Sequence, residues 1–325
     1  MRIVFFGATE LGFQCCQQLL GTGENVVGIF SIPQEFQISY SLSQVRNVTF
    51  RNFADLADRF SVPFVHMTTK MSESQYIEAL RAWRPDFGLV IGWYHMVPSV
   101  VRDLFPLGIA GIHASLLPKY RGGAPLVWAI INGEKRTGVS FFYFDGGVDT
   151  GDIIAQEELA ISENDTIKDI YQEATRASLN ILRQYIPRLR EGKAPRIPQN
   201  NEAATQFPQR KPDDGLIDWK SQTAKQIHNW IRAQTRPYPG AFTYLGTEKV
   251  SIWRAGISGF YQRELAPGTM LINLVSAPDA FGVCCADGQI LQVDEVGPPH
   301  GVPMSGAEFI AANSVEDGIV LGTAE

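Results

Sequence analysis

Twelve residues, Gly111 to Gly122, are the most informative part of this sequence. They read Gly111-Ile-His113-Ala-Ser-Leu-Leu-Pro-Lys-Tyr-Arg-Gly122, so an imidazole stands beside a turn of small residues after a short apolar segment. A second stretch, Asp145-Gly-Gly-Val-Asp149-Thr-Gly-Asp152, lies between two apolar runs that we interpret as strands. If these strands are neighbours, His113 and one carboxylate can meet at the strand ends, where open α/β sheets bind their ligands.

A histidine oriented by a carboxylate is a common general acid–base at neutral pH. A single histidine near a core strand is more often a structural residue, and a cluster of glycine and aspartate is more often a turn. Neither stretch alone identifies an active site, so the rest of the chain has to decide between these interpretations.

The composition is that of an ordinary globular protein with room for two domains. The chain has 325 residues, 45% hydrophobic and 19% charged, with a formal net charge of −6. This charge gives no general attraction to nucleic acid or anionic membranes. The four cysteines form two adjacent pairs, Cys15-Cys16 and Cys284-Cys285, which are poor disulfide partners and lack metal-ligand spacing. We predict buried thiols, no metal site and a reducing compartment.

The N-terminal half alternates apolar strands with amphipathic helices. Residues 2–6 enter directly as a strand without a signal-peptide hydrophobic region, and no apolar run approaches the roughly 18 residues of a membrane span, so we expect a cytoplasmic protein. The alternation predicts an α/β fold with a Rossmann-like, mostly parallel sheet and helices on both faces. The expected strands are 2–6, 25–30, 63–65, 86–91, 139–144 and 153–156, and the expected helices are 11–20, 53–60, 74–83, 124–132 and 166–189.

Two connections in this half carry functional expectations. Residues 31–50 have little periodicity, and a loop of that length predicts a substrate flap. The stretch Gly92-Trp-Tyr-His-Met-Val97 follows a buried strand, and its side chains suit either a slot for a flat heterocycle or packing under the next helix.

A change of composition marks a second domain. Residues 191–215 contain four prolines and almost no apolar periodicity, which is typical of a linker. After a helix at 224–233, short β-rich runs at 241–244, 249–254, 269–274, 281–285 and 290–296 predict a small open β-barrel of the OB-like type. We therefore expect a catalytic domain at 1–190, a linker at 191–215 and a C-terminal domain at 216–325.

These motifs together resemble the 10-formyltetrahydrofolate-dependent formyltransferase family. The resemblance begins with His113-Ala-Ser-Leu-Leu-Pro, continues through Val148-Asp-Thr-Gly-Asp152 and reaches Arg210-Lys-Pro-Asp-Asp214 and Pro237-Tyr-Pro-Gly-Ala241. It covers nearly the whole chain, in order. The pattern is similar to that of methionyl-tRNA formyltransferases and is closest to that of amino-sugar N-formyltransferases. It implies a Rossmann-like catalytic domain, a small β-barrel domain, and transfer of a formyl group from N10 of the folate to an amine in one-carbon metabolism.

The resemblance also implies roles for individual residues. His113 matches the general base and Asp149 the carboxylate that orients it. Lys119 and Arg121 suit either a diphosphate of the acceptor or a solvated loop. The positions matching the folate pocket are Trp93, Tyr94, His95, Met96, Val97, Asp145, Gly146, Gly147 and Val148. The positions expected beside the acceptor are Ser115, Lys119, Tyr120, Arg121 and Gly122.

One position departs from the family pattern. The family has Asn-x-His where this chain has Gly111-Ile-His113, so the carboxamide that would hydrogen-bond the formyl oxygen is missing. Loss of one such donor costs about 2.7–4 kcal/mol where it is used. The alternatives that follow are a divergent transferase, a 10-formyltetrahydrofolate hydrolase and a catalytically impaired folate binder.

The charge of the C-terminal region bears on the acceptor. Residues 208–325 contain 9 Lys and Arg against 13 Asp and Glu, and no Lys or Arg follows Arg263. Such a surface repels a phosphate backbone, whereas a tRNA-binding domain should be basic. We therefore expect a small amine, on a UDP- or dTDP-linked amino sugar, with methionyl-tRNA as the alternative. A homodimer is left open.

Overall fold

The computed structural model describes residues 1–37, 45–272, 277–298 and 301–322. The chain forms two compact units. The first comprises residues 1–122, 137–159 and 172–207, and the second comprises residues 123–136, 160–171 and 208–325. Most of the expected linker, up to residue 207, therefore packs with the first unit.

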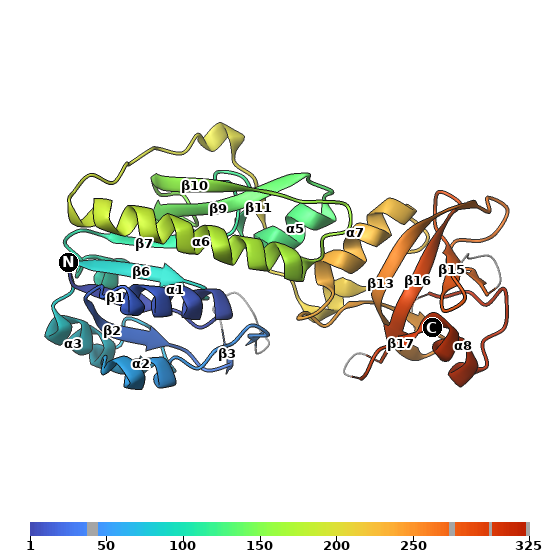
Figure 1. The fold of residues 1–325 in the computed structure, drawn as a ribbon, viewed down its shortest axis with the longest axis horizontal. Coiled ribbons are helices and arrows are strands. Elements are labelled where there is room, and N and C mark those ends of the chain that lie inside the picture. Colours follow the sequence, from blue (N-terminus) through green and yellow to red (C-terminus); the bar gives the residue numbers. More distant parts are fainter. Residues whose placement is uncertain (38–44, 273–276, 299–300, 323–325) are drawn as a thin grey trace. The chain divides into compact units, whose positions relative to one another are not determined.

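The first unit is built on a seven-stranded sheet (Figure 1) with the order β10-β9-β7-β6-β1-β2-β5. Neighbouring pairs from β7 through β6, β1 and β2 to β5 are parallel, whereas β9 runs antiparallel to β7. The strands are β1 (Ile3–Phe6), β2 (Val26–Ser31), β5 (Phe64–His66), β6 (Phe87–Ile91), β7 (Ile109–His113), β9 (Arg136–Tyr143) and β10 (Ile153–Ala160). The predicted mostly parallel sheet is confirmed.

Successive side chains of β1 point to opposite faces of this sheet, and both faces are covered. Phe6 packs in a cluster with Tyr76 and Leu80 of α3, while Phe5 stacks on Phe53 beside α2. Burying one such aromatic side chain stabilises the fold by about 1.5–3 kcal/mol. The helices are α1 (Glu10–Gly21), α2 (Ala54–Phe60), α3 (Ser74–Trp83), α4 (Ser99–Arg102) and α6 (Ile167–Arg190).

The turn from β1 into α1 depends on a glycine. A Cβ at Gly12 would lie 2.3 Å from the carbonyl oxygen of Ile91, so only glycine lets α1 approach β6 this closely. Thr9 caps the helix by accepting a hydrogen bond from the Gly12 N–H.

The expected flap is more ordered at its base than predicted. Two short antiparallel strands, β3 (Glu35–Phe36) and β4 (Val45–Arg46), close it, and residues 38–44 lie outside the described part of the chain. Asn47 is buried directly after β4 and donates to the carbonyl of Ala8 at 2.9 Å. The sequence prediction missed these strands because two-residue strands carry no periodicity.

The second unit contains an antiparallel sheet of order β12-β13-β16-β15-β14, with β17 paired to β16. It curls into a half-barrel, which confirms the predicted OB-like domain (Figure 1). Its strands are β12 (Ala241–Leu245), β13 (Glu248–Tyr261), β14 (Met270–Leu271), β15 (Phe281–Cys284), β16 (Gln289–Gly297) and β17 (Met304–Ser305). Its helices are α5 (Pro125–Ile131), α7 (Ala224–Gln234) and α8 (Gly306–Asn313).

Strand β13 is longer than expected, and α8 was not predicted. The extra length of β13 contains Gly256 and Gly259, which lower its apparent β propensity, yet it pairs with β16 as far as Tyr261. Tertiary pairing thus overrides the local signal.

All four cysteines are free and buried, as predicted. Burial raises the pKa of the Cys285 thiol to about 12, so it stays protonated at neutral pH. Within the described residues, no helix is long and apolar enough to cross a membrane, and no cluster of three or more His, Cys, Asp or Glu side chains could hold a metal ion.

Arg210 links three segments of the second unit. Its guanidinium lies 4.8 Å from the ring centre of Trp128 in α5 and 4.7 Å from that of Trp230 in α7. It also donates to Gln234 Oε1 at 2.8 Å. Burial lowers the pKa of this guanidinium, but the two aromatic faces and the amide oxygen receive its charge.

We expect Arg210→Ala to destabilise the protein by about 2–4 kcal/mol, because two cation–π contacts and two charged hydrogen bonds, to Gln234 and to the carbonyl of Asp214, are lost. Arg210→Lys should recover little, since an ammonium cannot stack between two rings. Urea unfolding followed by tryptophan fluorescence measures the change, with exposed Lys220→Ala as control. A fully stable Arg210→Lys would show that charge alone suffices.

Candidate active site

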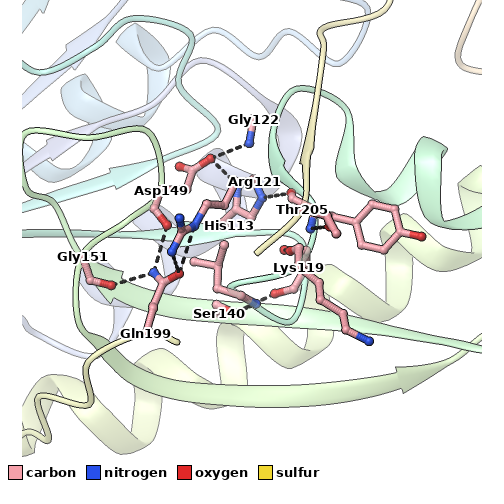
Figure 2. A network of polar contacts seen from close by, with 12 residues as sticks. His113, Lys119, Arg121, Gly122, Ser140, Asp149, Gly151, Gln199 and Thr205 are labelled. Atoms are coloured by element: carbon pink, nitrogen blue, oxygen red, sulfur yellow. Dashed lines mark hydrogen bonds and ion pairs between the residues drawn. The ribbon is translucent and has the colours of Figure 1, made fainter. Parts of the chain in front are cut away.

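His113 ends β7, and the antiparallel neighbour β9 determines what it meets. Tyr143 pairs with Ala110 and Ser140 pairs with His113, so the loop after β9 starts at the beginning of β7 and runs back along it. In this way Asp149 reaches the imidazole (Figure 2): His113 Nδ1 lies 3.5 Å from Asp149 Oδ2. The two side chains are only 10% and 20% exposed, so the contact is largely shielded from water.

The position of Asp149 is defined by its backbone and by its carboxylate. Its φ of 55° is left-handed, a conformation that needs support from neighbouring contacts in a residue with a side chain. The Gly122 N–H donates to Oδ2 at 2.9 Å. At Gly151 a Cβ would lie 1.8 Å from the carbonyl oxygen of Tyr143, so this loop requires glycine there.

The second ring nitrogen of His113 is also engaged. Nε2 lies 2.7 Å from the carbonyl oxygen of Tyr120, and a carbonyl can only accept, so Nε2 carries a proton. The nitrogen with an available lone pair in the neutral ring is then Nδ1, which faces Asp149. The arrangement can take up one proton at Nδ1 and place the resulting imidazolium beside a carboxylate.

Gly111 lies in β7 with no space for a side chain. A Cβ there would lie 2.3 Å from the carbonyl oxygen of Val90 and 2.7 Å from the ring of Phe144. Phe144, the first residue after β9, occupies the space toward which a side chain at 111 would point. The space that an asparagine side chain would need at position 111 is therefore filled by Val90 and Phe144.

The two stretches expected to bind folate lie close to each other around Arg102. Its Nη1 donates to the carbonyl oxygen of Val97 at 2.6 Å, and its Nη2 would lie 3.9 Å from a Cβ at Gly146. Met96 and Val148, one on each stretch, are 52% and 41% exposed. Two exposed apolar side chains on neighbouring stretches suit a flat heterocycle.

The remaining side chains of these stretches divide between packing and binding. Tyr94 donates to Asn47 Oδ1 at 3.1 Å, and His95 packs against Phe36, with burial lowering the pKa of its imidazole. Trp93 Nε1 is buried without a hydrogen-bond partner among the described residues, so a donor is available here. The Asp145 carboxylate accepts from the Gly147 N–H and the Thr150 hydroxyl, which braces the loop.

The expected acceptor-side residues are mostly engaged inside the protein. Ser115 is buried and its hydroxyl donates to the carbonyl of Lys119 at 2.6 Å, while Tyr120 stacks on Phe207 at 4.8 Å. Arg121 is 8% exposed, and its guanidinium binds Gln199 and Asn201. These contacts use three of the five N–H donors of Arg121, and together with its burial they argue against phosphate binding by this side chain. Lys119 remains exposed.

Sequence reasoning missed two residues that contact this site. Gln199 and Thr205 come from the expected linker, where Thr205 Oγ1 accepts from the Tyr120 N–H at 2.8 Å. A polar residue in a proline-rich stretch carries no local signal of a distant partner, so only the fold reveals them.

Comparison with known proteins identifies the family. The family model "Formyl transferase" matches residues 1–186, and the model "Formyl transferase, C-terminal domain" matches residues 210–314. The chain belongs to the formyl transferase family. The resemblance of the motifs is thereby confirmed, and with it an enzyme of folate-dependent formyl transfer.

Similar proteins include enzymes with different acceptors. Methionyl-tRNA formyltransferase of Acetivibrio thermocellus is 31% identical over 99% of this chain and 100% of its own length. The enzyme of the same name from Desulforamulus reducens is 33% identical over 99% of this chain and 98% of its own. A solved sugar 3N-formyl transferase, WlaRD, in the presence of dTDP and 5-N-formyl-THF, has a TM-score of 0.63 at 19% identity, covering 90% of this chain and 97% of its own. This last likeness shows the fold.

We expect Gly111→Asn to destabilise the protein by about 1–3 kcal/mol without restoring an oxyanion donor, because its Cβ meets the backbone of Val90. Gly111→Ala adds the same Cβ without the carboxamide and should be destabilised similarly. Gly21→Ala, where nothing lies within 4 Å, is the control. Thermal unfolding and turnover are measured together. A stable Gly111→Asn with raised turnover would mean that only the donor is missing.

Proposed function

We propose that this chain transfers the formyl group of 10-formyltetrahydrofolate to a primary amine, with His113 as general base and Asp149 as the carboxylate that orients it. The observation that supports this most directly is the close contact between His113 and Asp149 within a domain matched by the family. The shielding of both side chains from water favours proton transfer between His113 and a bound substrate.

The donor fits the residues around Arg102. Main-chain groups of the 93–97 turn and the 145–148 loop would bind the edge of the pterin, and Met96 and Val148 would cover its faces. The Trp93 indole N–H offers an additional donor. The folate supplies the activated formyl carbon, and the protein supplies orientation and proton transfer.

The chemistry assigns one proton to His113. As the amine nitrogen attacks the formyl carbon, it loses a proton, and the carbonyl oxygen becomes an oxyanion. Since Nε2 is bonded to Tyr120, the proton passes to the lone pair of Nδ1, and the resulting Nδ1–H can then donate to the Asp149 carboxylate. The imidazolium then stabilises the oxyanion of the formyl group and returns the proton to N10 of the departing folate. With glycine at 111, the positive charge of the imidazolium has to replace part of the oxyanion stabilisation that an asparagine carboxamide would give.

Two acceptor classes remain, each favoured by one observation. The full-length relatives named above are methionyl-tRNA formyltransferases, and the similarity spans both domains, so methionyl-tRNA is the acceptor that the comparisons favour. This reverses the order expected from the sequence. The acidic balance of residues 208–325 favours a small amine, on a nucleotide-linked sugar, because it opposes binding of a polyanion.

We expect His113→Ala to lower turnover by about 10²–10⁴-fold, because the base is lost, while binding of 10-formyltetrahydrofolate is retained. An assay of formyl transfer measures turnover, and a fluorescence titration measures binding of 10-formyltetrahydrofolate. His66→Ala, an exposed histidine of β5, is the control. Unchanged turnover of His113→Ala would contradict its role as base.

The acceptor is decided by assaying methionyl-tRNA beside UDP- and dTDP-linked amino sugars at 50 and 200 mM salt. A protein that makes 6–10 phosphate contacts loses about 10³–10⁵ in affinity over this range, whereas a small amine acceptor should change little. Turnover with methionyl-tRNA that falls steeply with salt supports the first class. Salt-insensitive turnover with an amino sugar supports the second. Formate release without any acceptor would instead identify a hydrolase and contradict formyl transfer.

A further inference from the structure

Gln199 makes four hydrogen bonds with its side-chain amide (Figure 2). Nε2 donates to the main-chain carbonyl oxygens of Asp149 at 2.9 Å and Gly151 at 2.7 Å. Oε1 accepts from Arg121 Nε at 3.1 Å and from Arg121 Nη2 at 2.7 Å. A carboxamide has two N–H donors and two acceptor lone pairs, so its hydrogen-bonding capacity is completely used.

The hydrogen bonds of Gln199 reach the two segments that contact His113. On one side, Asp149 places its carboxylate next to Nδ1 of the imidazole. On the other side, Arg121 stands between Tyr120, whose carbonyl binds Nε2, and Gly122, whose N–H binds the Asp149 carboxylate. Gln199 therefore connects the two segments that hold the imidazole at its two nitrogens.

We infer that Gln199 is a positioning residue of the formyl-transfer site: by joining Arg121 to the carbonyls of Asp149 and Gly151, it sets the geometry of the His113–Asp149 pair. The inference rests on the proposed function. Asp149 has a left-handed backbone, a conformation that Asp tolerates but that is less favourable than the right-handed one, and the bond from Gln199 to its carbonyl helps to hold it. A displacement of about 1 Å at a reacting group is enough to reduce a rate about 10²-fold.

The linker itself does not depend on Gln199 for its attachment. Strand β11 (Gln206–Phe207) pairs in parallel with β8 (Arg121–Gly122), and Thr205 accepts from the Tyr120 N–H. Asn201 Oδ1 also accepts from Arg121 at 2.8 Å. A variant at 199 should therefore fold with the linker in place and alter the loop that carries Asp149.

The first test compares Gln199→Ala and Gln199→Glu with Asn200→Ala. The glutamate keeps oxygen acceptors for Arg121, but it loses the N–H donors and its carboxylate repels the carbonyl oxygens of Asp149 and Gly151. Asn200 lies next to Gln199, and its side chain only caps the short helix at Asn201–Ala203. We expect kcat to fall about 10²-fold in both Gln199 variants, with the Kd of 10-formyltetrahydrofolate changed less than about twofold, and no effect of Asn200→Ala. Wild-type kcat in Gln199→Glu would overturn the inference.

The second test asks whether Gln199 acts through Asp149. In an Asp149→Asn background, Gln199→Ala should lower kcat by less than about twofold, because residues that act as one unit are not additive. An undiminished loss of about 10²-fold in that background would show an independent role and overturn the inference.

A third measurement does not require turnover. We expect the ¹⁵N signals of the His113 imidazole, assigned with His113→Gln, to shift in Gln199→Ala and Gln199→Glu and to stay in place in Asn200→Ala. Unshifted signals in the Gln199 variants would overturn the inference. If the wild-type protein transferred no formyl group to any amine, the proposed function would fail, while these signals would still show whether Gln199 positions His113.

Discussion

Antiparallel pairing of β9 with β7 is the constraint on which the candidate active site depends. In a wholly parallel arrangement the loop after β9 would leave at the same end as His113. Here it leaves beside Ala110 and has to travel back along β7 to reach the imidazole. That path passes Gly111, turns at a left-handed Asp149 and requires Gly151 close to Tyr143. Glycine at 151 is therefore a requirement of the close approach of this loop to the end of β9.

This chain accommodates charge inside its two units at three guanidinium groups, of which two are buried (Arg121 and Arg232) and one is half-buried (Arg210). Arg121 is bonded to side-chain amides, Arg210 lies between two indoles and donates to an amide oxygen, and Arg232 donates to the carbonyls of Ser162 and Asp165 and to an amide oxygen of Asn229. A planar, delocalised cation with five N–H donors suits such neutral partners. In each case the arginine joins segments distant in sequence, so charge that looks solvent-exposed in the sequence serves as an internal connection.

This chain differs in two features from what we expect of a methionyl-tRNA formyltransferase. Its C-terminal domain is acidic, and it has Gly111 in place of the usual asparagine. The identity with methionyl-tRNA formyltransferases spans both domains, yet the position of the usual carboxamide is closed by Val90 and Phe144. Under the proposed mechanism, stabilisation of the oxyanion therefore comes from groups that remain, foremost the protonated imidazole of His113. Because position 111 offers no side-chain donor, we expect the contacts that orient the His113 imidazole to matter more here than in a site that has one.

Apolar periodicity and short motifs are local properties of the chain, so the sequence alone predicts most of the longer strands and helices, the family, and the approach of Asp149 to His113. It also indicated the half-barrel of the C-terminal domain through short β-rich runs. It could not show that Arg121 is buried, that Phe144 closes the space beside Gly111, or that Gln199 holds Asp149. Those facts depend on contacts between residues 30 to 80 positions apart, and only the tertiary structure decides which of many polar side chains in a loop meets a partner.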